Sequence, residues 1–385
     1  MARIRMGWMG WMGIVAAVAA LGCVVRAAYV EGDQTKAGSP AAKSEPPIIK
    51  SSHVPEVLAL LGNLTVDPPR RHKNMLVFPI RYSGKQAPGS WTTLDDATAA
   101  GSLKVSEKDQ ASVPEVVVEN TGDKAVLVLS GEIIKGGRQT RVAQKDAIIE
   151  SKQKVAMAVF CVEQHRWAGG KEFKGSGNMA PASIQDSIKR GADQGRVWEG
   201  VRSSNQNLSP AAAPPTESLD EGMNSAPAKA RKEAAHKDLG HFSPPDTIGI
   251  AVADSRTGRV VGLELFGRRD LFERLQEKLI EGYALDIVPP DPAGDDAASK
   301  KMTEKDVEAF IARVLEGTSR YEETPGSGRG IDLTSGTIHG KGVAVGESAI
   351  HLSIQDLQAN PTPVRPIVTP SPTPRDPPAV YRGRE

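Results

Sequence analysis

The chain has 385 residues, of which 39% are hydrophobic and 25% are charged, proportions typical of a globular protein with a sizeable core. The 48 basic and 47 acidic residues leave a formal charge of +1, which excludes the basic electrostatic footprint expected of a nucleic-acid-binding protein. Two cysteines, Cys23 and Cys161, are too few for a disulfide scaffold, so stability must come from the core.

Residues 1–27 predict an export signal. A basic start precedes an uncharged run from Met6 to Val25, whose apolar centre has the length of a signal-peptide h-region. Cleavage near Ala27, lipid attachment at Cys23 and retention as an anchor are three alternatives. Each predicts an exported body that is periplasmic, secreted or anchored facing outward, with membrane contact confined to this segment.

The body is flanked by two segments of low apolar content. Residues 28–53 are rich in Gly, Ser, Pro, Ala and Lys, a composition that cannot bury enough apolar surface to offset ordering entropy, so a disordered linker is expected. Residues 359–385 are Pro-rich. This composition favours an extended disordered tail or a docking segment for a protein partner.

Between these flanks, residues 54–358 are expected to form a single α+β domain with a predominantly antiparallel β body. Met75 to Tyr82 suits a buried strand. A short helix follows, with Thr93 as its N-cap and Gly101 as its stop. The next strands are short and separated by polar turns, a pattern typical of antiparallel pairing.

The middle of the body predicts two more strands around a glycine pair. Gly136 and Gly137 interrupt a strand, as expected where a bulge or reversal needs positive φ. Residues 154–163 are apolar on both faces, which predicts a central and fully buried strand. A Gly- and Lys-rich loop is expected after Trp167.

The second half predicts a few amphipathic helices. Residues 182–203 have the apolar spacing of a broken helix, whereas 203–245 are expected to be a mobile insertion with at most a short helix. Two strands and a helix between 247 and 287 form a β-β-α unit. A linker at 289–300, a helix capped by Thr303 and closing strands complete the body.

Polar side chains stand among the apolar, strand-like runs from Ser130 to Trp167. Because buried polar groups need partners, these side chains must either pair with one another or contact a ligand. The candidates are Glu132, Gln139, Arg141, Cys161, Glu163, Arg166 and Trp167.

Several short motifs resemble those of an uncharacterised bacterial family, the ARG-and-rhodanese-phosphatase-superfamily-associated protein domain. They are TLDDA at 93–97, GEIIKGGRQTRV at 131–142, CVEQHRW at 161–167, YALDIV at 283–288 and His351 in the last strand. The resemblance spans roughly Met75 to Gln355 and implies that the seven candidates form one constellation. It carries no established reaction. At Arg138, Thr140 and His165 the chain departs from the Lys, Asn and Gly of the family pattern, and His165 adds a side chain beside the predicted site.

Two functions remain open for the carboxylates. Glu132 and Glu163 suit a general acid/base pair in a hydrolase acting on an ADP-ribosyl or other phosphorylated ligand. Alternatively each neutralises an arginine, Glu132 with Arg141 or Glu163 with Arg166, because buried carboxylates need partners.

In the second case the protein is a ligand-binding or accessory module of the envelope. Arg141 and Arg166 suit bidentate recognition of an anionic small molecule. Trp167 and Trp198 suit stacking on a base, although the sequence favours core packing over stacking for Trp167.

Cys161 is expected to be packed core rather than a nucleophile, because an apolar strand raises the pKa of a thiol. The seven histidines have no metal-ligand spacing, and with one cysteine in the body neither a metal site nor a cofactor is predicted.

Overall fold

The structure, a computed structural model, describes residues 52–108, 114–208, 214–242, 244–288 and 299–358. The predicted export segment, nearly all of the 28–53 linker, the Pro-rich tail and most of the linker at 289–300 lie outside the described residues. Within the described ranges, no helix is long and apolar enough to cross a membrane.

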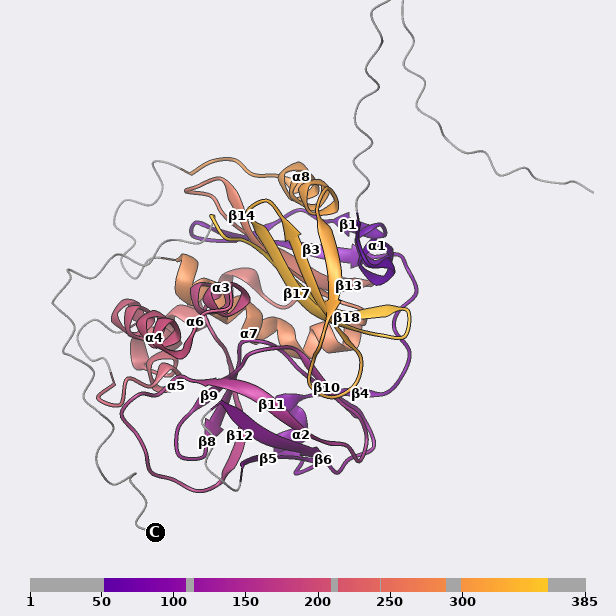
Figure 1. The fold of residues 1–385 in the computed structure, drawn as a ribbon. Helices are drawn as coiled ribbons and strands as arrows, with labels where there is room; N and C mark the ends of the chain where they lie inside the picture. Colours follow the sequence, from indigo (N-terminus) through magenta and orange to yellow (C-terminus); the bar gives the residue numbers. More distant parts are fainter. Residues whose placement is uncertain (1–51, 109–113, 209–213, 243, 289–298, 359–385) are drawn as a thin grey trace, which may run out of the picture. The chain divides into compact units, whose positions relative to one another are not determined.

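Nine antiparallel strands form the largest sheet in the described part of the chain (Figure 1). They are β1 (Leu64–Val66), β2 (Arg70–His72), β3 (Met75–Tyr82), β13 (Thr247–Asp254), β14 (Arg259–Phe266), β15 (Thr318–Glu322), β16 (Arg329–Ser335), β17 (Ile338–Val345) and β18 (Ser348–Asp356). Eight of them follow the order β1-β3-β13-β14-β18-β17-β16-β15, and β2 pairs with β3.

Both faces of this sheet are covered. Helix α7 (Arg269–Ile287) packs on the face that carries Val77 and Ile250. Helices α1 (Pro55–Leu61) and α8 (Glu304–Leu315) pack on the opposite face. Strand β3 therefore has apolar residues on both sides, as its uninterrupted apolar sequence predicts.

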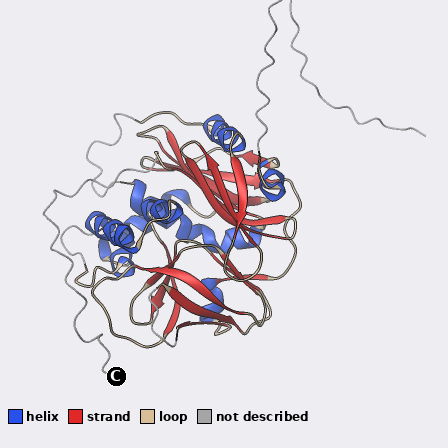
Figure 2. Cartoon of the chain, viewed as in Figure 1, coloured by secondary structure: helices blue, strands red, loops and turns tan. Residues whose placement is uncertain are grey.

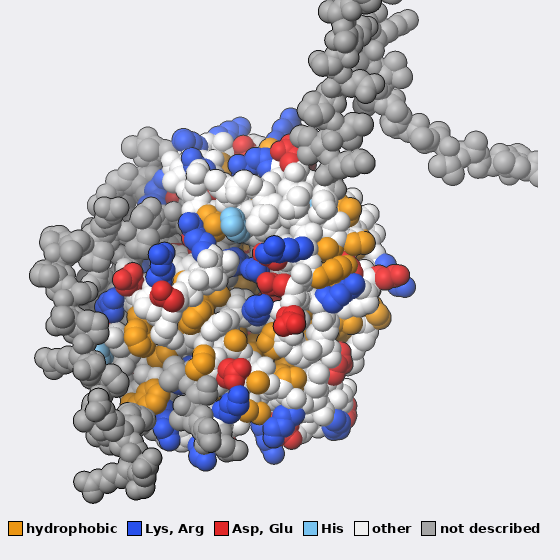
Figure 3. Space-filling view, in the orientation of Figure 1, with side chains coloured by type: hydrophobic (Ala, Val, Ile, Leu, Met, Phe, Trp, Pro, Cys, Tyr) orange, Lys and Arg blue, Asp and Glu red, His pale blue; other side chains and the backbone are white. Residues whose placement is uncertain are grey.

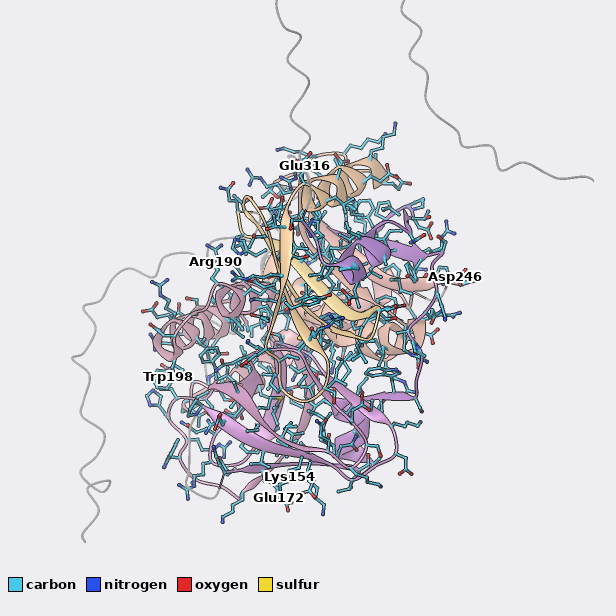
Figure 4. The ribbon with its side chains drawn as sticks, turned by 45° about the vertical axis from the view of Figure 1, so that its right-hand side comes forward. Lys154, Glu172, Arg190, Trp198, Asp246 and Glu316 are labelled. Atoms are coloured by element: carbon cyan, nitrogen blue, oxygen red, sulfur yellow. The ribbon has the colours of Figure 1, made fainter. Side chains whose placement is uncertain are left out.

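Six other strands close into a barrel, which lies beside the sheet in Figure 2. They are β5 (Leu103–Glu107), β6 (Glu115–Asn120), β8 (Glu132–Gly136), β9 (Arg141–Ala143), β11 (Lys154–Cys161) and β12 (Glu172–Met179), in the order β11-β6-β5-β12-β8-β9. Figure 4 places Lys154 and Glu172, the first residues of β11 and β12, on the side of the barrel away from the large sheet.

A three-stranded sheet and a short helix complete the barrel core. The strands are β4 (Trp91–Thr93), β7 (Ala125–Val128) and β10 (Ala147–Ile149), and the helix is α2 (Leu94–Ala99). Leu94 and Ala97 of α2 pack with the inward residues of the barrel strands. Thr93 caps α2 by accepting a hydrogen bond from the Asp96 amide, as predicted.

Four helices pack against the outside of β8 and β9 through a separate apolar cluster. They are α3 (Ala182–Lys189), α4 (Gln194–Leu208), α5 (Leu219–Met223) and α6 (Ala226–Leu239). The break between α3 and α4 matches the predicted broken helix, with Gly191 at positive φ.

The structure differs from the prediction in this layer. The range 203–245, expected to hold at most a short helix, carries the end of α4 and all of α5 and α6. Helix α6 has 14 residues and buries Ala235 and Leu239 in the core shared with α7. Its apolar residues are mostly alanines, so its sequence has no strong apolar stripe, and only tertiary contacts reveal its buried side.

Two other predictions are wrong around the barrel. The expected loop after Trp167 contains β12, which pairs with β5 and β8 and so closes the barrel despite its glycines. Strand β11 pairs on both sides, but full burial is confined to Met157, Val159 and Cys161 on its inward face, and Ala156 on the other face is exposed.

The predicted class is confirmed. The described residues form an α+β fold dominated by antiparallel strands, with β4 and β7 as a parallel pair. The β-β-α unit is present as β13, β14 and α7. Gly136 and Gly137 both have positive φ and reverse the chain between β8 and β9.

Candidate functional site

Arg141 and Cys161 face the interior of the barrel near the end of its core. They are direct cross-strand partners on β9 and β11. Each continues an inward-facing row, Arg141 after Ala143 and Cys161 after Val159, because alternate residues of a strand share a face. The sequence thus places a charged side chain where the rows otherwise consist of apolar residues.

The Arg141 side chain is buried but only partly paired. It is 1% exposed, and its Nη1 donates to Gln139 Oε1 at 3.1 Å. Its Nη2 lies 3.9 Å from Glu107 Oε1, which is beyond hydrogen-bond distance. Its Nε has no partner within the described residues.

The neighbours of Arg141 are tied to the chain after β11. Gln139 Nε2 donates to the Glu163 carbonyl at 2.8 Å, and the Cys161 thiol donates to the same carbonyl at 3.0 Å. Burial raises the pKa of the Cys161 thiol, although Arg141 opposes this rise. A thiol with a raised pKa is a poor nucleophile at neutral pH, in agreement with the prediction.

Glu163 forms the ion pair with Arg166 that the sequence offered as one alternative. Arg166 donates through Nε and Nη2 at 2.8 and 2.7 Å, and Thr140 donates through its amide and hydroxyl at 2.8 and 2.9 Å. Burial disfavours the charge, but hydrogen bonds from Arg166 and Thr140 hold the pKa of Glu163 below its ordinary value. Three of these bonds end on Oε2 and one on Oε1, so both carboxylate oxygens are engaged.

Glu132 lies in a different group, which we call the Lys278 cluster and which comprises Asp95, Glu132 and Lys278. Lys278 of α7 donates to Glu132 and, at 2.6 Å, to Asp95 of α2. The second Glu132 oxygen accepts from the Leu129 amide at 2.7 Å. The predicted alternative of a Glu132–Arg141 pair is therefore wrong.

The charges of the Lys278 cluster depend on one another. Burial raises the pKa of Glu132, an effect that Lys278 opposes. Burial also disfavours the Lys278 ammonium, but Glu132 and Asp95 outweigh it and raise the pKa of Lys278. The cluster is a closed ion group between the barrel, α2 and α7.

The aromatic candidates lie near the surface. Trp167 is 40% exposed, so its alternative as core packing is wrong. Trp198 on α4 is partly buried in the helical layer, at whose edge it appears in Figure 4. The His165 imidazole lies 3.7 Å from the Glu217 carboxylate, which directs it toward the helical layer.

A third group, of which the sequence indicated only Tyr283 and His351, lies between the large sheet and the helices. We call it the His351 cluster, and it comprises Asp146, Lys189, Glu264, Tyr283, His351 and Ser353. His351 Nδ1 lies 2.7 Å from Asp146 and its Nε2 lies 3.3 Å from Glu264. Glu264 stands in the apolar run of β14, and this was the sequence signal for the cluster.

The two carboxylates hold His351 as a cation. Burial alone would lower the pKa of the imidazole, but Asp146 and Glu264 raise it to about 9. A histidine that remains protonated at neutral pH does not serve as a general base. In the described part of the chain, no group of three or more His, Cys, Asp or Glu side chains is arranged to hold a metal ion.

Residues 63–355 match the family described as the ARG and Rhodanese-Phosphatase-superfamily-associated Protein domain, ARPP-1. The chain belongs to this family. No curated protein and no solved structure matches the chain.

The residues that carry the ARPP-1 resemblance do not form one constellation in this fold. Gln139, Arg141, Cys161, Glu163 and Arg166 are linked by hydrogen bonds at the barrel. Asp95 and Glu132 belong to the Lys278 cluster, and Tyr283 and His351 to the His351 cluster. Asp286 instead caps α3 by accepting from Ser183.

Proposed function

We propose that this ARPP-1 domain is a ligand-binding module and that Arg141 binds an oxyanion, such as a carboxylate or phosphate group, at the barrel. The observation that supports this is the incomplete pairing of a guanidinium that is almost entirely buried. An incompletely paired buried charge is costly, so a partner from outside the chain would stabilise it.

The geometry of Arg141 suits this class of ligand. Gln139 accepts from Nη1, and Nε has no hydrogen-bond partner among the described residues. Nη2, which shares an edge of the guanidinium with Nε, lies 3.9 Å from Glu107 Oε1. That edge is one of the two faces through which a guanidinium binds a carboxylate or phosphate with two parallel hydrogen bonds. Glu107 does not occupy it, because its nearest contact is the 3.9 Å approach to Nη2.

A hydrolase that uses Glu132 or Glu163 receives less support. Glu163 already accepts four hydrogen bonds, and its lowered pKa disfavours the protonated form that a general acid needs. Glu132 is fully buried and bound to Lys278. Neither carboxylate offers a free oxygen to a substrate.

We infer a location outside the cytoplasm from the uncharged run between Met6 and Val25. The family description, which names an association with other proteins, supports an accessory role. Fusing residues 1–53 to a reporter that is active only after export tests the location. Activity of the fusion is expected, and inactivity would contradict export.

Thermal-shift measurements test the oxyanion site. Phosphate, acetate, AMP and ADP-ribose are titrated against the wild-type protein, Arg141→Gln and Arg141→Lys, with the exposed Arg320→Gln as the control. At least one anion is expected to raise the Tm of the wild type and of Arg320→Gln. The shift should vanish in Arg141→Gln and shrink in Arg141→Lys, which keeps the charge but loses the planar fork. An equal shift in Arg141→Gln would refute the site.

A further inference from the structure

We propose that Lys189 is an imine-forming amine that takes a small aldehyde or ketone, with Ser353 and Glu264 relaying protons beside it. This site is separate from Arg141 and does not depend on the oxyanion proposal.

Lys189 belongs to a continuous chain of hydrogen bonds. Its Nζ donates to Ser353 Oγ at 2.8 Å, and Ser353 Oγ donates to Glu264 Oε1 at 2.8 Å. Tyr283 donates its hydroxyl to the same carboxylate oxygen at 2.7 Å. Because Ser353 accepts from Lys189 rather than donating to it, the lone pair of a neutral Lys189 amine is not engaged by Ser353.

Lys278 has carboxylate partners for its ammonium group, whereas Lys189 has none within 4 Å among the described residues. Both lysines are buried to the same degree, with exposures of 6% for Lys278 and 7% for Lys189. Lys278 is ion-paired with Glu132 and Asp95. Within the described residues, no carboxylate lies within 4 Å of the Lys189 ammonium, and a neutral hydroxyl is its hydrogen-bond partner.

Burial without an ion pair favours the neutral amine. Desolvation lowers the pKa of Lys189, although Glu264, Asp186 and Asp146 oppose the effect from a distance. A desolvated lysine with a depressed pKa is the usual form of a lysine that attacks carbonyl compounds.

A polar row leads from solvent to this amine. Glu264, Ser353, Lys341, Asp332 and Arg320 are successive cross-strand partners on β14, β18, β17, β16 and β15. Glu264 is buried, Lys341 is 26% exposed and Arg320 is 80% exposed. Asp332, between the last two, is 14% exposed and pairs with both. Figure 3 shows side chains of both charges gathered over the region where β17 lies in Figure 1.

The end of α3 also approaches the surface. Arg190, the residue after Lys189, points outward in Figure 4 and is half exposed. Lys189 points the other way, to Ser353 on the sheet. The amine therefore lies next to Ser353, at the buried end of the polar row.

The reaction balances without a further reagent. The neutral Lys189 amine adds to the carbonyl carbon. A proton from nitrogen passes to Ser353 as the Ser353 proton moves to Glu264, and the reverse transfer lets Ser353 protonate the former carbonyl oxygen, which gives a carbinolamine. Loss of that hydroxyl with a second nitrogen proton yields the imine and one water molecule. Ser353 and Glu264 end in their starting protonation states.

Reductive trapping tests this site in the full chain. The protein is incubated with acetaldehyde and cyanoborohydride at neutral pH, and modified lysines are located by peptide mass spectrometry. Lys189 is expected to react at least about tenfold faster than Lys278, because the pKa is lowered at Lys189 and raised at Lys278, and each unit of pKa difference between two amines changes the ratio of their neutral fractions about tenfold. Modification of Lys189 no faster than that of Lys278 would overturn the proposal.

Variants of Ser353 separate proton relay from simple accessibility. Ser353→Ala is expected to slow trapping at Lys189 and to change its pH profile, whereas Ser353→Thr, which keeps the hydroxyl, should restore both. Circular dichroism confirms that each variant is folded. Equal rates and pH profiles in wild type and Ser353→Ala would refute the relay, and failure of Thr to restore the rate would also count against it.

Discussion

Arg141 and Lys278 are two buried cations that the fold treats differently. Lys278 joins α7 to the barrel and to α2 through Glu132 and Asp95. Arg141 lies inside the barrel with one amide oxygen in hydrogen-bond range and a carboxylate 3.9 Å away. Both side chains have almost no exposed surface.

The difference shows that burial of a charge does not by itself mark a functional site. The Lys278 cluster is closed, because each charged group has a partner of opposite sign, so its role is to join elements. The Nε donor of Arg141 has no acceptor among the described residues, so an anion from outside the chain would supply the missing hydrogen bond. Four changes test this contrast.

The largest effect is expected from Lys278→Met. Removing the ammonium leaves Glu132 buried without its counter-charge, and loss of one partner of a buried pair typically costs about 3–5 kcal/mol. Urea denaturation measures the loss. The double variant Lys278→Met/Glu132→Gln should recover part of the lost stability, because it also removes the unpaired charge of Glu132. If Lys278→Met lost no more stability than Arg141→Met, the two buried cations would not differ in their contribution to stability.

Alkaline pH should weaken the His351 cluster. The folded-state pKa of His351 is raised from 6.5 to about 9, so its contribution to stability is complete below pH 6.5 and is lost as pH rises through 9. Thermal denaturation between these pH values should show a falling Tm. His351→Gln should flatten this slope, and an unchanged slope in the variant would assign the pH dependence to other groups.

Glu163→Gln is expected to lower stability less than Lys278→Met does. The substitution keeps the shape of the side chain but weakens its bonds to Arg166 and Thr140. Because the Arg166 guanidinium is partly exposed and can be solvated, we expect a loss of about 1–2 kcal/mol in urea denaturation. The pKa of Glu163 is lowered in the folded state, so wild-type stability should also fall in acid more than that of the variant.

The smallest effect on stability is expected from Arg141→Met. Methionine replaces the charged side chain with an apolar one of similar volume, and few groups lose a partner. The free energy of unfolding should therefore fall by less than about 1 kcal/mol, or rise. Urea denaturation without added anion measures it. A loss as large as that of Lys278→Met would mean that Arg141 is structural and would weaken the oxyanion proposal.

Local rules predicted many of the elements correctly. The N-cap at Thr93, the strand Met75–Tyr82 and the positive φ of Gly136 and Gly137 are found where the sequence indicated. Each depends on neighbours within a few residues. The β-β-α unit was found for the same reason, because its turn and its apolar spacing are local patterns.

Pairing over long distances in sequence could not be predicted in the same way. Glu132 pairs with Lys278, which is 146 residues away, and Asp146 contacts His351 across 205 residues. Glu163 and Arg166 are three residues apart, and their ion pair was predicted correctly as one of the alternatives. The helices at 203–245 and strand β12 were missed because their burial depends on contacts with distant elements.

The sequence by itself determined which residues are strand, turn and cap over much of the body, and it identified polar groups in apolar surroundings as the features to explain. Only the tertiary structure decided which of those groups neutralise one another. The physical reason is that secondary structure follows from short-range sterics and periodicity, whereas the partner of a buried charge depends on which elements the fold brings within hydrogen-bond distance. Arg141 and Lys189 stand out from the other buried cations for this reason.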